Sequence, residues 1–356
     1  MIQSSELRAG ELVEVRSKEE ILSTLDKNGQ LDGLPFMPEM FEHCGKRFRV
    51  FKRAHKTCDP PNGLRGRRML HTVHLEELRC NGAFHGGCQA RCLVFWKEAW
   101  LRPVASQSVQ LPVLQNFNGD LSPESQKCSE RDVLAASKHD AEEEESNDTV
   151  YVCQSTQVAQ ASQALPWWDV RQYVEDYTSG NVRASQLAAS FLLLLYSKVV
   201  SAGIGLGSPL RWIYDSIQKI KGGTRYPWRS GKVPRGAKTP ALSLDLQPGE
   251  LVRVRSYEEI LETLTAEGHN RGMVFDAEMV PYCGGTYRVL DRVNTIVNEK
   301  TGKLQHLKND CIMLDQVTCL ACYAKYRRFC PRRIYPFWRE IWLERVSSNN
   351  ECETVR

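Results

Sequence analysis

Cysteine is the residue whose spacing in this sequence most clearly suggests chemistry, because two groups of thiols recur in a similar pattern. Cys80 and Cys88 stand in a C-x7-C spacing, and Cys322 and Cys330 repeat it. With their neighbours, the candidate sets are Cys44, Cys80, Cys88 and Cys92, and Cys283, Cys319, Cys322 and Cys330. Four thiolates satisfy a tetrahedral Zn²⁺, and such a closed site contributes folding free energy directly. The sequence therefore predicts a zinc site in each half, with iron as the alternative metal.

Two alternatives to this metal assignment stay open. Neither half contains the twin C-x2-C knuckles of a zinc ribbon, and free cysteines are often ordinary small buried hydrophobes. The register of the cysteines is also ambiguous, since Cys80 aligns with Cys322 through the shared spacing and with Cys319 through the preceding strand. Each register leaves four thiols in each half.

The first half carries more potential metal ligands than the second. The additional residues, which have no metal-binding counterparts at the aligned positions, are His71, His74, His85 and Cys58. His85 and Cys88 flank a flexible diglycine, which could bring an imidazole and a thiol together. A mixed Cys/His set with an open position would suit catalytic zinc or iron. If the protein is a metalloenzyme, we expect its chemistry here. The alternative is that each histidine is a solvated or hydrogen-bonded strand residue.

The thiols belong to a sequence that occurs twice. GELVEVRSKEEILSTL at 10–25 and GELVRVRSYEEILETL at 249–264 are identical at thirteen of sixteen positions, and the alignment continues without a gap to residues 50 and 289. Both copies end on an aromatic segment, FWKEAWL at 95–101 and FWREIWL at 337–343. A repeated unit of this length indicates internal duplication.

Each copy predicts short strands with one helical excursion near its start. Apolar residues alternate in the opening strand, and KEEILSTL follows with leucine and isoleucine at helical spacing. About five short strands that close on themselves would form an SH3-like small β-barrel, which removes exposed edges. The predicted fold class is therefore mainly β with α insertions, as two tandem SH3-like barrels. An α+β sandwich of the same elements is the alternative.

The region between the repeats differs in composition along its length. The expected order is a Cys/His-rich repeat at 8–104, an acidic disordered linker at 105–165, a helical Trp-rich segment at 166–222, a basic linker at 223–248 and a Cys-rich repeat at 249–346. The acidic linker is rich in Ser, Gln and Glu, which cannot build a core. We expect the aromatic side chains of the helical segment to pack as core.

Composition sets bounds on partners and compartment. The chain is 25% charged and 42% hydrophobic, and its net charge of +4 is too small to indicate a nucleic-acid or membrane partner. The N-terminal residues lack the apolar region of a secretory signal, so we expect thirteen reduced cysteines in the cytoplasm. The longest apolar run, 187–200, is interrupted by Ser and Lys, and no membrane span is expected.

Sequence motifs outside the cysteine sets do not indicate a particular function. The sequence has no Gly-rich phosphate loop, Gly-x-Ser-x-Gly elbow or His-Glu-x-x-His motif. Basic clusters at 65–68 and 325–333 have aromatic neighbours. RNA or single-stranded DNA binding is therefore a third hypothesis, although such clusters are more often solvated loops.

The repeats resemble a group of bacterial proteins built from one or two such units. The resemblance lies in the GELVxVRSxEEI opening, the Cys-Gly pair and the FWKEAWL or FWREIWL ending, and it brings no activity. We expect a cytoplasmic, metal-binding tandem-repeat protein that acts as an accessory or interaction module with a protein partner, serving a biosynthetic pathway. A metalloenzyme with a Cys/His site in the first repeat is the leading alternative.

Overall fold

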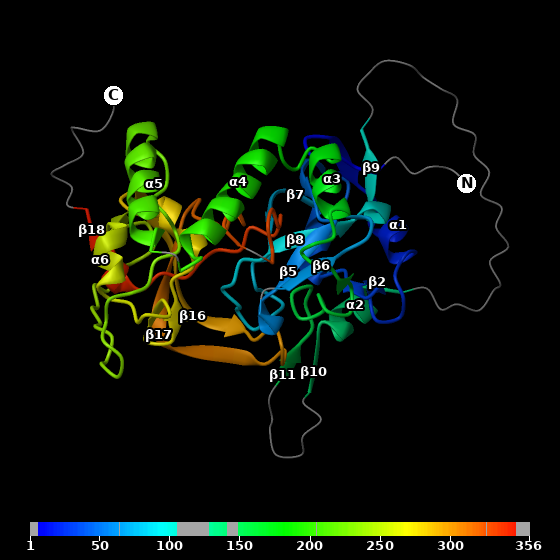
Figure 1. Ribbon diagram of the computed structural model, residues 1–356. Helices are drawn as coiled ribbons and strands as arrows, with labels where there is room; N and C mark the ends of the chain where they lie inside the picture. The colour runs from blue at the N-terminus through cyan, green and yellow to red at the C-terminus, as the bar shows by residue number, and fades with distance from the viewer. Residues whose placement is uncertain are drawn as a thin grey trace. The chain divides into compact units, whose positions relative to one another are not determined.

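The computed structural model describes residues 6–63, 65–104, 128–140, 149–203, 205–324 and 326–346. The chain divides into a first unit, Met1–Cys88, Cys92–Asn181 and Val297–Leu304, and a second unit, Gln89–Arg91, Val182–Ile296 and Gln305–Arg356 (Figure 1). Each unit is built on one curled sheet and has its own hydrophobic core. The coarse fold class, mainly β with a few helices, is thus confirmed.

The main sheet of the first unit has the strand order β8-β7-β4-β1-β9. Its strands are β1 (Leu12–Val15), β4 (Arg47–Arg53), β7 (Thr72–Arg79), β8 (Leu93–Lys97) and β9 (Leu101–Pro103), paired antiparallel throughout. The register between β4 and β7 shifts between Val50 and Lys52. Such an irregularity bends a strand, which helps the sheet to curl.

The remaining elements of the first unit are short. They are α1 (Lys18–Leu22), β2 (Gln30–Leu31), β3 (Leu34–Pro35), η1 (Pro38–His43), β5 (Lys56–Asp59), η2 (Pro60–Asn62), β6 (Arg65–Arg68), η3 (Glu98–Trp100), α2 (Glu130–Ala136), β10 (Lys138–Asp140), β11 (Thr149–Tyr151), β12 (Gln163–Ala164) and α3 (Arg171–Thr178). α1 begins at a capping box: Glu20 N donates to Ser17 Oγ, and Ser17 N donates to the Glu20 carboxylate. This explains why a helix of one turn forms directly after β1.

The second unit has the sheet order β17-β16-β13-β18. Its elements are α4 (Ala184–Val200), α5 (Gly207–Lys221), β13 (Leu251–Val254), α6 (Tyr257–Leu261), β14 (His269–Asn270), β15 (Met273–Val274), η4 (Ala277–Tyr282), β16 (Thr286–Val297), β17 (Leu304–Leu314), η5 (Glu340–Trp342) and β18 (Leu343–Arg345). α6 begins at a capping box of Ser256 and Glu259, as α1 does with its own pair.

Strands at corresponding sequence positions pair in corresponding registers. Val13 on β1 lies opposite Phe48 on β4, and Val252 on β13 lies opposite Tyr287 on β16. The closing strands agree as well, because β9 pairs with β1 and β18 pairs with β13, both antiparallel. The same local sequence therefore produces the same strand arrangement in both units.

A phenylalanine and two tryptophans form the centre of each core. Phe36 packs edge-on against Trp96 and Trp100, with ring centroids 6.2 and 5.1 Å away. In the second unit Phe275 makes the same contacts with Trp338 and Trp342, at 6.0 and 5.2 Å. The second tryptophan of each pair also donates its indole N–H to a threonine hydroxyl, Trp100 to Thr24 and Trp342 to Thr263. Large buried aromatic rings are strong core anchors, and Trp100 and Trp342 are in addition fixed in direction by these hydrogen bonds.

The structure differs from the expected linker at 105–165. Residues 128–140 and 149–165 are folded into the first unit, where they form α2, β10, β11 and β12. Their apolar side chains, including those of Val133 and Val158, join the hydrophobic core. Sequence composition missed them because single apolar residues are scattered among polar ones. Residues 105–127 and the acidic stretch 141–148 lie outside the described residues.

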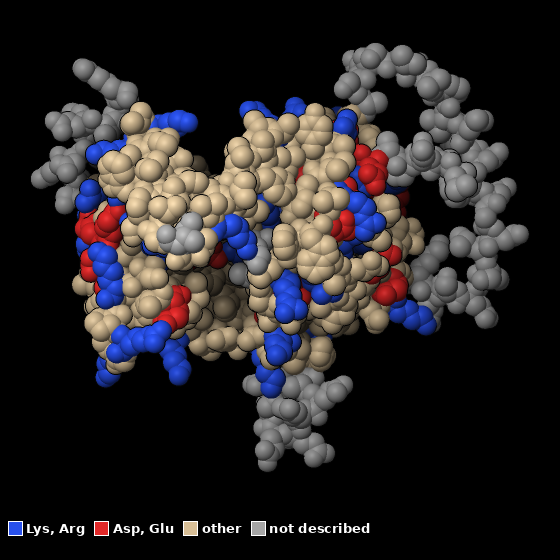
Figure 2. All heavy atoms as spheres, in the orientation of Figure 1, with Lys and Arg blue, Asp and Glu red and all other residues tan. Residues whose placement is uncertain are grey.

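The helical segment contains the expected helices, but its aromatic side chains are largely on the surface. Trp168 is 67% exposed and Trp212 is 70% exposed, and most large apolar side chains of α4 and α5 are also exposed. Large areas over these two helices carry neither acidic nor basic groups (Figure 2). The prediction that the aromatic residues pack as core is wrong for Trp168 and Trp212. Among the described helices, none has the length and apolar character needed to cross a bilayer.

The stretch at 223–248 packs along the second unit. Tyr226 and Leu246 are buried there, and Tyr257 Oη donates to the Pro227 carbonyl at 2.8 Å. Val233 forms a parallel bridge with Thr265. This basic stretch is therefore fixed to the second core by apolar contacts and backbone hydrogen bonds.

Gln154 tests whether residues 149–165 are an integral part of the first unit. Its buried amide accepts from Phe95 N at 2.8 Å and donates to the carbonyls of Phe95 and Pro35 at 2.8 and 3.1 Å. We expect Gln154→Leu to lower the free energy of unfolding by about 2 to 4 kcal/mol, because it leaves buried backbone groups unpaired. The exposed Gln160 supplies the control. Gln160→Leu should change the free energy of unfolding by less than about 0.5 kcal/mol, as measured in denaturant melts. Equal effects would contradict the integral role.

Candidate metal centre

Three potential metal ligands from separate parts of the first unit converge. Glu39 lies on η1, Cys80 follows β7 directly, and His85 lies in the loop from β7 to β8. One ligand atom of each lies within 4.8 Å of the others. His85 Nδ1 is 3.7 Å from Cys80 Sγ and 3.7 Å from Glu39 Oε1.

The loop between Cys80 and Cys92 folds back on itself and positions the imidazole. Cys80 N donates to the Cys92 carbonyl at 2.9 Å, which closes the ends of the loop. Within it, His85 N donates to the Gly82 carbonyl at 2.9 Å. Gly82 has a φ of +75°, and a Cβ there would lie 2.1 Å from the Cys88 carbonyl oxygen. The tight turn that places His85 beside Cys80 therefore requires glycine.

The Glu39 carboxylate is buried without ordinary stabilisation. The residue is 7% exposed. Among the described residues, neither of its oxygens has a hydrogen-bond partner. A buried ionised carboxylate without a partner is strongly unfavourable, so such a group normally faces a cation.

Burial also disfavours the charged forms of the two neighbouring ligands, Cys80 and His85. Burial raises the pKa of the Cys80 thiol, and the negative charges of Glu39 and Cys92 act in the same direction. Burial lowers the pKa of His85, against the opposing effects of Glu39 and the Val152 carbonyl. A neutral imidazole is the form that binds a metal, and a bound cation would favour the thiolate that the free protein disfavours.

The geometry distinguishes metal binding from a nucleophilic relay. In a Cys-His-acid relay, one ring nitrogen faces the thiol and the other faces the acid. Here the same Nδ1 faces both Cys80 and Glu39. Ligand atoms bound to tetrahedral Zn²⁺ at about 2.0 to 2.3 Å lie roughly 3.3 to 3.8 Å from one another. The two separations of 3.7 Å fall in this range, so the arrangement suits a common ion.

The predicted thiols of the first half are only partly gathered at this cluster. Cys92 is outside the set of ligand atoms within 4.8 Å of one another, but its backbone carbonyl is bonded to Cys80 N, and its sulfur accepts from Ser155 Oγ at 3.2 Å. Cys88 Sγ accepts from Val297 N at 3.2 Å. Cys44 packs against the hydrophobic core, and the charges that act on it come from Lys18, Glu19 and Glu130.

The other residues singled out in the first half lie outside the ligand cluster. His74 is buried on β7, with Nδ1 2.9 Å from the Val94 carbonyl oxygen, whereas the exposed His71 faces Glu98. Cys58 is buried on β5.

Two residues near the cluster were missed from sequence. Glu39 looks like any other acid, and Cys153 was placed in the linker. Burial, which only the structure provides, distinguishes both. Cys153 is partly buried against the core, and this desolvation raises its pKa to about 12, with the charges of Cys92 and Cys88 adding to the effect.

The second unit satisfies the corresponding carboxylate in a different way. Glu278, which aligns with Glu39, is 2% exposed. It accepts hydrogen bonds from the backbone N–H groups of the loop, at 3.0, 2.6 and 2.9 Å from Cys322, Tyr323 and Ala324. Burial raises the pKa of Glu278, and the N–H donors oppose that rise. The charge of Arg327 opposes the rise as well, so this carboxylate is satisfied by groups of the protein itself.

The four predicted thiols of the second half do not form a comparable cluster. In the described part of the second unit, no three Cys, His, Asp or Glu ligand atoms come within 4.8 Å of one another. Cys319 lies near Tyr282, while Cys283 packs against the core. Cys322 Sγ approaches the Leu320 carbonyl at 3.6 Å, and Cys330 is buried.

Comparisons with known proteins add nothing to this geometry. No protein-family model matches the chain, and no curated protein and no solved structure matches it either.

The aligned glutamates supply a matched pair of variants. In chelator-treated protein, we expect Glu278→Gln to lower the free energy of unfolding by about 1 to 3 kcal/mol, because an amide cannot accept all three N–H groups. Glu39→Gln should be neutral or stabilising, because it removes a buried charge without hydrogen bonds. Thermal and denaturant melts of both variants measure the difference. A similar loss in both would show that Glu39 has a partner in the free protein.

Proposed function

We propose that the first unit binds one divalent metal ion, with zinc preferred, through Glu39, Cys80 and His85. The observation that carries this proposal is the buried Glu39 carboxylate, which has no hydrogen-bond partner among the described residues and faces a thiol and an imidazole. A carboxylate, a thiolate and an imidazole form a mixed donor set that suits zinc, and iron is the alternative.

Cys92 is the proposed fourth ligand. It is the other thiol whose charge acts on Cys80, and its backbone carbonyl is bonded to Cys80 N. Two thiolates, one carboxylate and one imidazole would complete a tetrahedral shell. His85 is 1% exposed and Glu39 is 7% exposed, while Cys80 and Cys92 are half-buried, so an ion held by these four residues would be shielded from solvent mainly on the side of His85 and Glu39. Shielding and four protein ligands favour a structural ion over a catalytic one with an exchangeable position.

This site supports the accessory or interaction role over the metalloenzyme alternative. A closed structural ion fixes the loop 80–92 against η1 but offers no open position to a substrate. The large apolar side chains exposed on α4 and α5 are consistent with a protein partner. Service to a particular biosynthetic pathway stays a hypothesis without a supporting contact.

The two units are proposed to be duplicated copies of one SH3-like small barrel. The supporting observations are the matching strand registers and the equivalent Phe-Trp-Trp clusters. On this view, both copies kept the buried glutamate, and their loops neutralise it differently. The first copy uses a metal, and the second uses backbone N–H groups. The expected domain limits 8–104 and 249–346 belong to the same proposal.

RNA or single-stranded DNA binding receives less support. Basic and acidic side chains are interspersed on the face shown in Figure 2. Arg67 and Arg68 of the first basic cluster are used internally, bonded to Ser162 and Glu175. A cytoplasmic location for the protein belongs to the proposed accessory or interaction role.

Elemental analysis of the purified protein tests the metal proposal. We expect about one zinc per chain, and His85→Ala and Cys80→Ser should each reduce it at least tenfold. Both should also lower the melting temperature, since structural metal binding contributes folding free energy. Chelation of the unaltered protein should produce the same decrease in melting temperature.

Cys44→Ser and Cys319→Ser provide the controls. Each changes a thiol of the predicted sets that lies outside the Glu39 cluster, and each should retain the metal. Cys92→Ser separates the four-ligand from the three-ligand arrangement, because only a direct ligand should weaken zinc binding by more than tenfold. A protein without stoichiometric metal, or a metal retained in His85→Ala, would overturn the proposal.

A further inference from the structure

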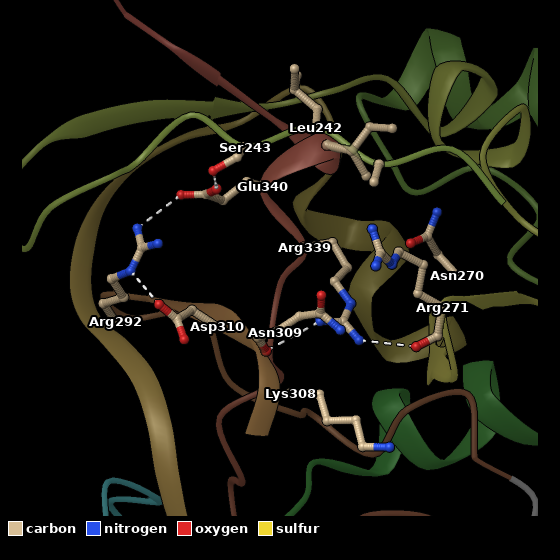
Figure 3. Close-up of a pocket in the computed structure, with 12 residues that line it drawn as sticks. Leu242, Ser243, Asn270, Arg271, Arg292, Lys308, Asn309, Asp310, Arg339 and Glu340 are labelled. Atoms are coloured by element: carbon tan, nitrogen blue, oxygen red, sulfur yellow. Dashed lines mark hydrogen bonds and ion pairs between the residues drawn. The ribbon is translucent and has the colours of Figure 1, made fainter. Parts of the chain in front are cut away.

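A basic cavity of about 400 Å³ opens in the second unit, separate from the candidate metal centre. Figure 3 shows its walls, which come from the β14–β15 turn, from β17 and from the segment that contains η5. Leu242 and Ile341 provide apolar surface. Its charged lining residues are Arg271, Arg292, Lys308, Asp310, Arg339 and Glu340. The volume is typical of pockets that bind small molecules.

The charges of this cavity do not balance. Arg292 is neutralised by Asp310 at 2.7 Å and Glu340 at 3.1 Å. Among the described ion pairs, neither Arg271 nor Lys308 has a carboxylate partner. Within the described part of the chain, the Arg339 side chain donates to the Asn309 and Arg271 carbonyls and to Cys311 Sγ. The lining therefore holds four cations and two carboxylates, and because both carboxylates pair with Arg292, the other three cationic groups give the cavity an excess of positive charge.

The first unit has an ion pair at the aligned positions. Asp32 aligns with Arg271 and Lys97 aligns with Arg339, and Lys97 Nζ lies 2.9 Å from Asp32 Oδ2. The backbone is the same at the turn, with φ of 51° at Asp32 and 47° at Arg271. The second unit has thus replaced the acid of an ion pair with a second cation. Two neighbouring cations repel unless an anion lies between them.

We propose that this cavity binds a small organic phosphate. Arginine guanidinium groups match phosphate oxygens with paired N–H donors, and lysine adds a point charge. Arg271, Arg339 and Lys308 would hold the phosphate, and Leu242 and Ile341 would contact the organic part. The ligand is a free small molecule, because the cavity is of small-molecule size. This proposal is independent of the metal site.

Inorganic pyrophosphate is the probe, measured by calorimetry and thermal shift on the full chain at constant ionic strength. We expect saturable binding and a raised melting temperature. Arg271→Asp should weaken binding at least tenfold, because it restores the ion pair of the first unit. Without pyrophosphate this variant should melt at the same temperature as the unaltered protein or higher, which shows that the loss is not unfolding.

Lys219→Asp is the matched control, since it makes the same charge change at an exposed position on α5, outside the cavity. It should leave pyrophosphate affinity within about twofold. No binding at millimolar pyrophosphate would overturn the proposal, as would equal losses in the two variants. Binding of a single-stranded oligonucleotide that Arg271→Asp abolishes, without pyrophosphate binding, would replace the small ligand with a nucleic acid.

Discussion

A buried carboxylate on a short 3₁₀ helix imposes the same physical problem on both units. Water is excluded at Glu39 and Glu278, so each negative charge must find donors or a cation. In each unit these groups come from the loop that follows the third strand of the sheet along the chain, β7 in the first unit and β17 in the second. In the second unit it presents backbone N–H groups to Glu278, and in the first it presents Cys80 and His85 to Glu39. The remaining features of both loops follow from this difference.

The aromatic core keeps the position of the carboxylate constant while the loops vary. Phe36 lies three residues before Glu39 and packs between Trp96 and Trp100, so the start of η1 is fixed to the closing segment of the sheet. Phe275 fixes η4 in the same manner. The indole N–H bonds to Thr24 and Thr263 add a directional constraint. A rigid frame of this kind allows a loop to exchange its ligands without displacing the group that it must neutralise.

Much of the fold was predictable because its signals are local. The alternating apolar residues of the opening strand, the leucine and isoleucine spacing of KEEILSTL and the aromatic ending led to strands and a helix that the structure contains. The site was less predictable. Cys80 and His85 were proposed as ligands, but Glu39 was not, since burial depends on residues distant in sequence. Cys88, the second cysteine of the C-x7-C spacing, lies outside the three-residue cluster and accepts a hydrogen bond from Val297 N, which no local pattern reveals.

Differences between charged residues at aligned positions explain why the two units would bind different ligands. In the first unit Asp32 and Lys97 neutralise each other, and the unbalanced charge is the buried one at Glu39. In the second unit Glu278 is satisfied by the backbone, and the unbalanced charges are the cations around the cavity. A buried charge of this kind calls for an ion that is held permanently, whereas cations at an open cavity can exchange their anion with solvent. Stability would therefore reside in the first unit's metal, and reversible binding in the second unit's cavity.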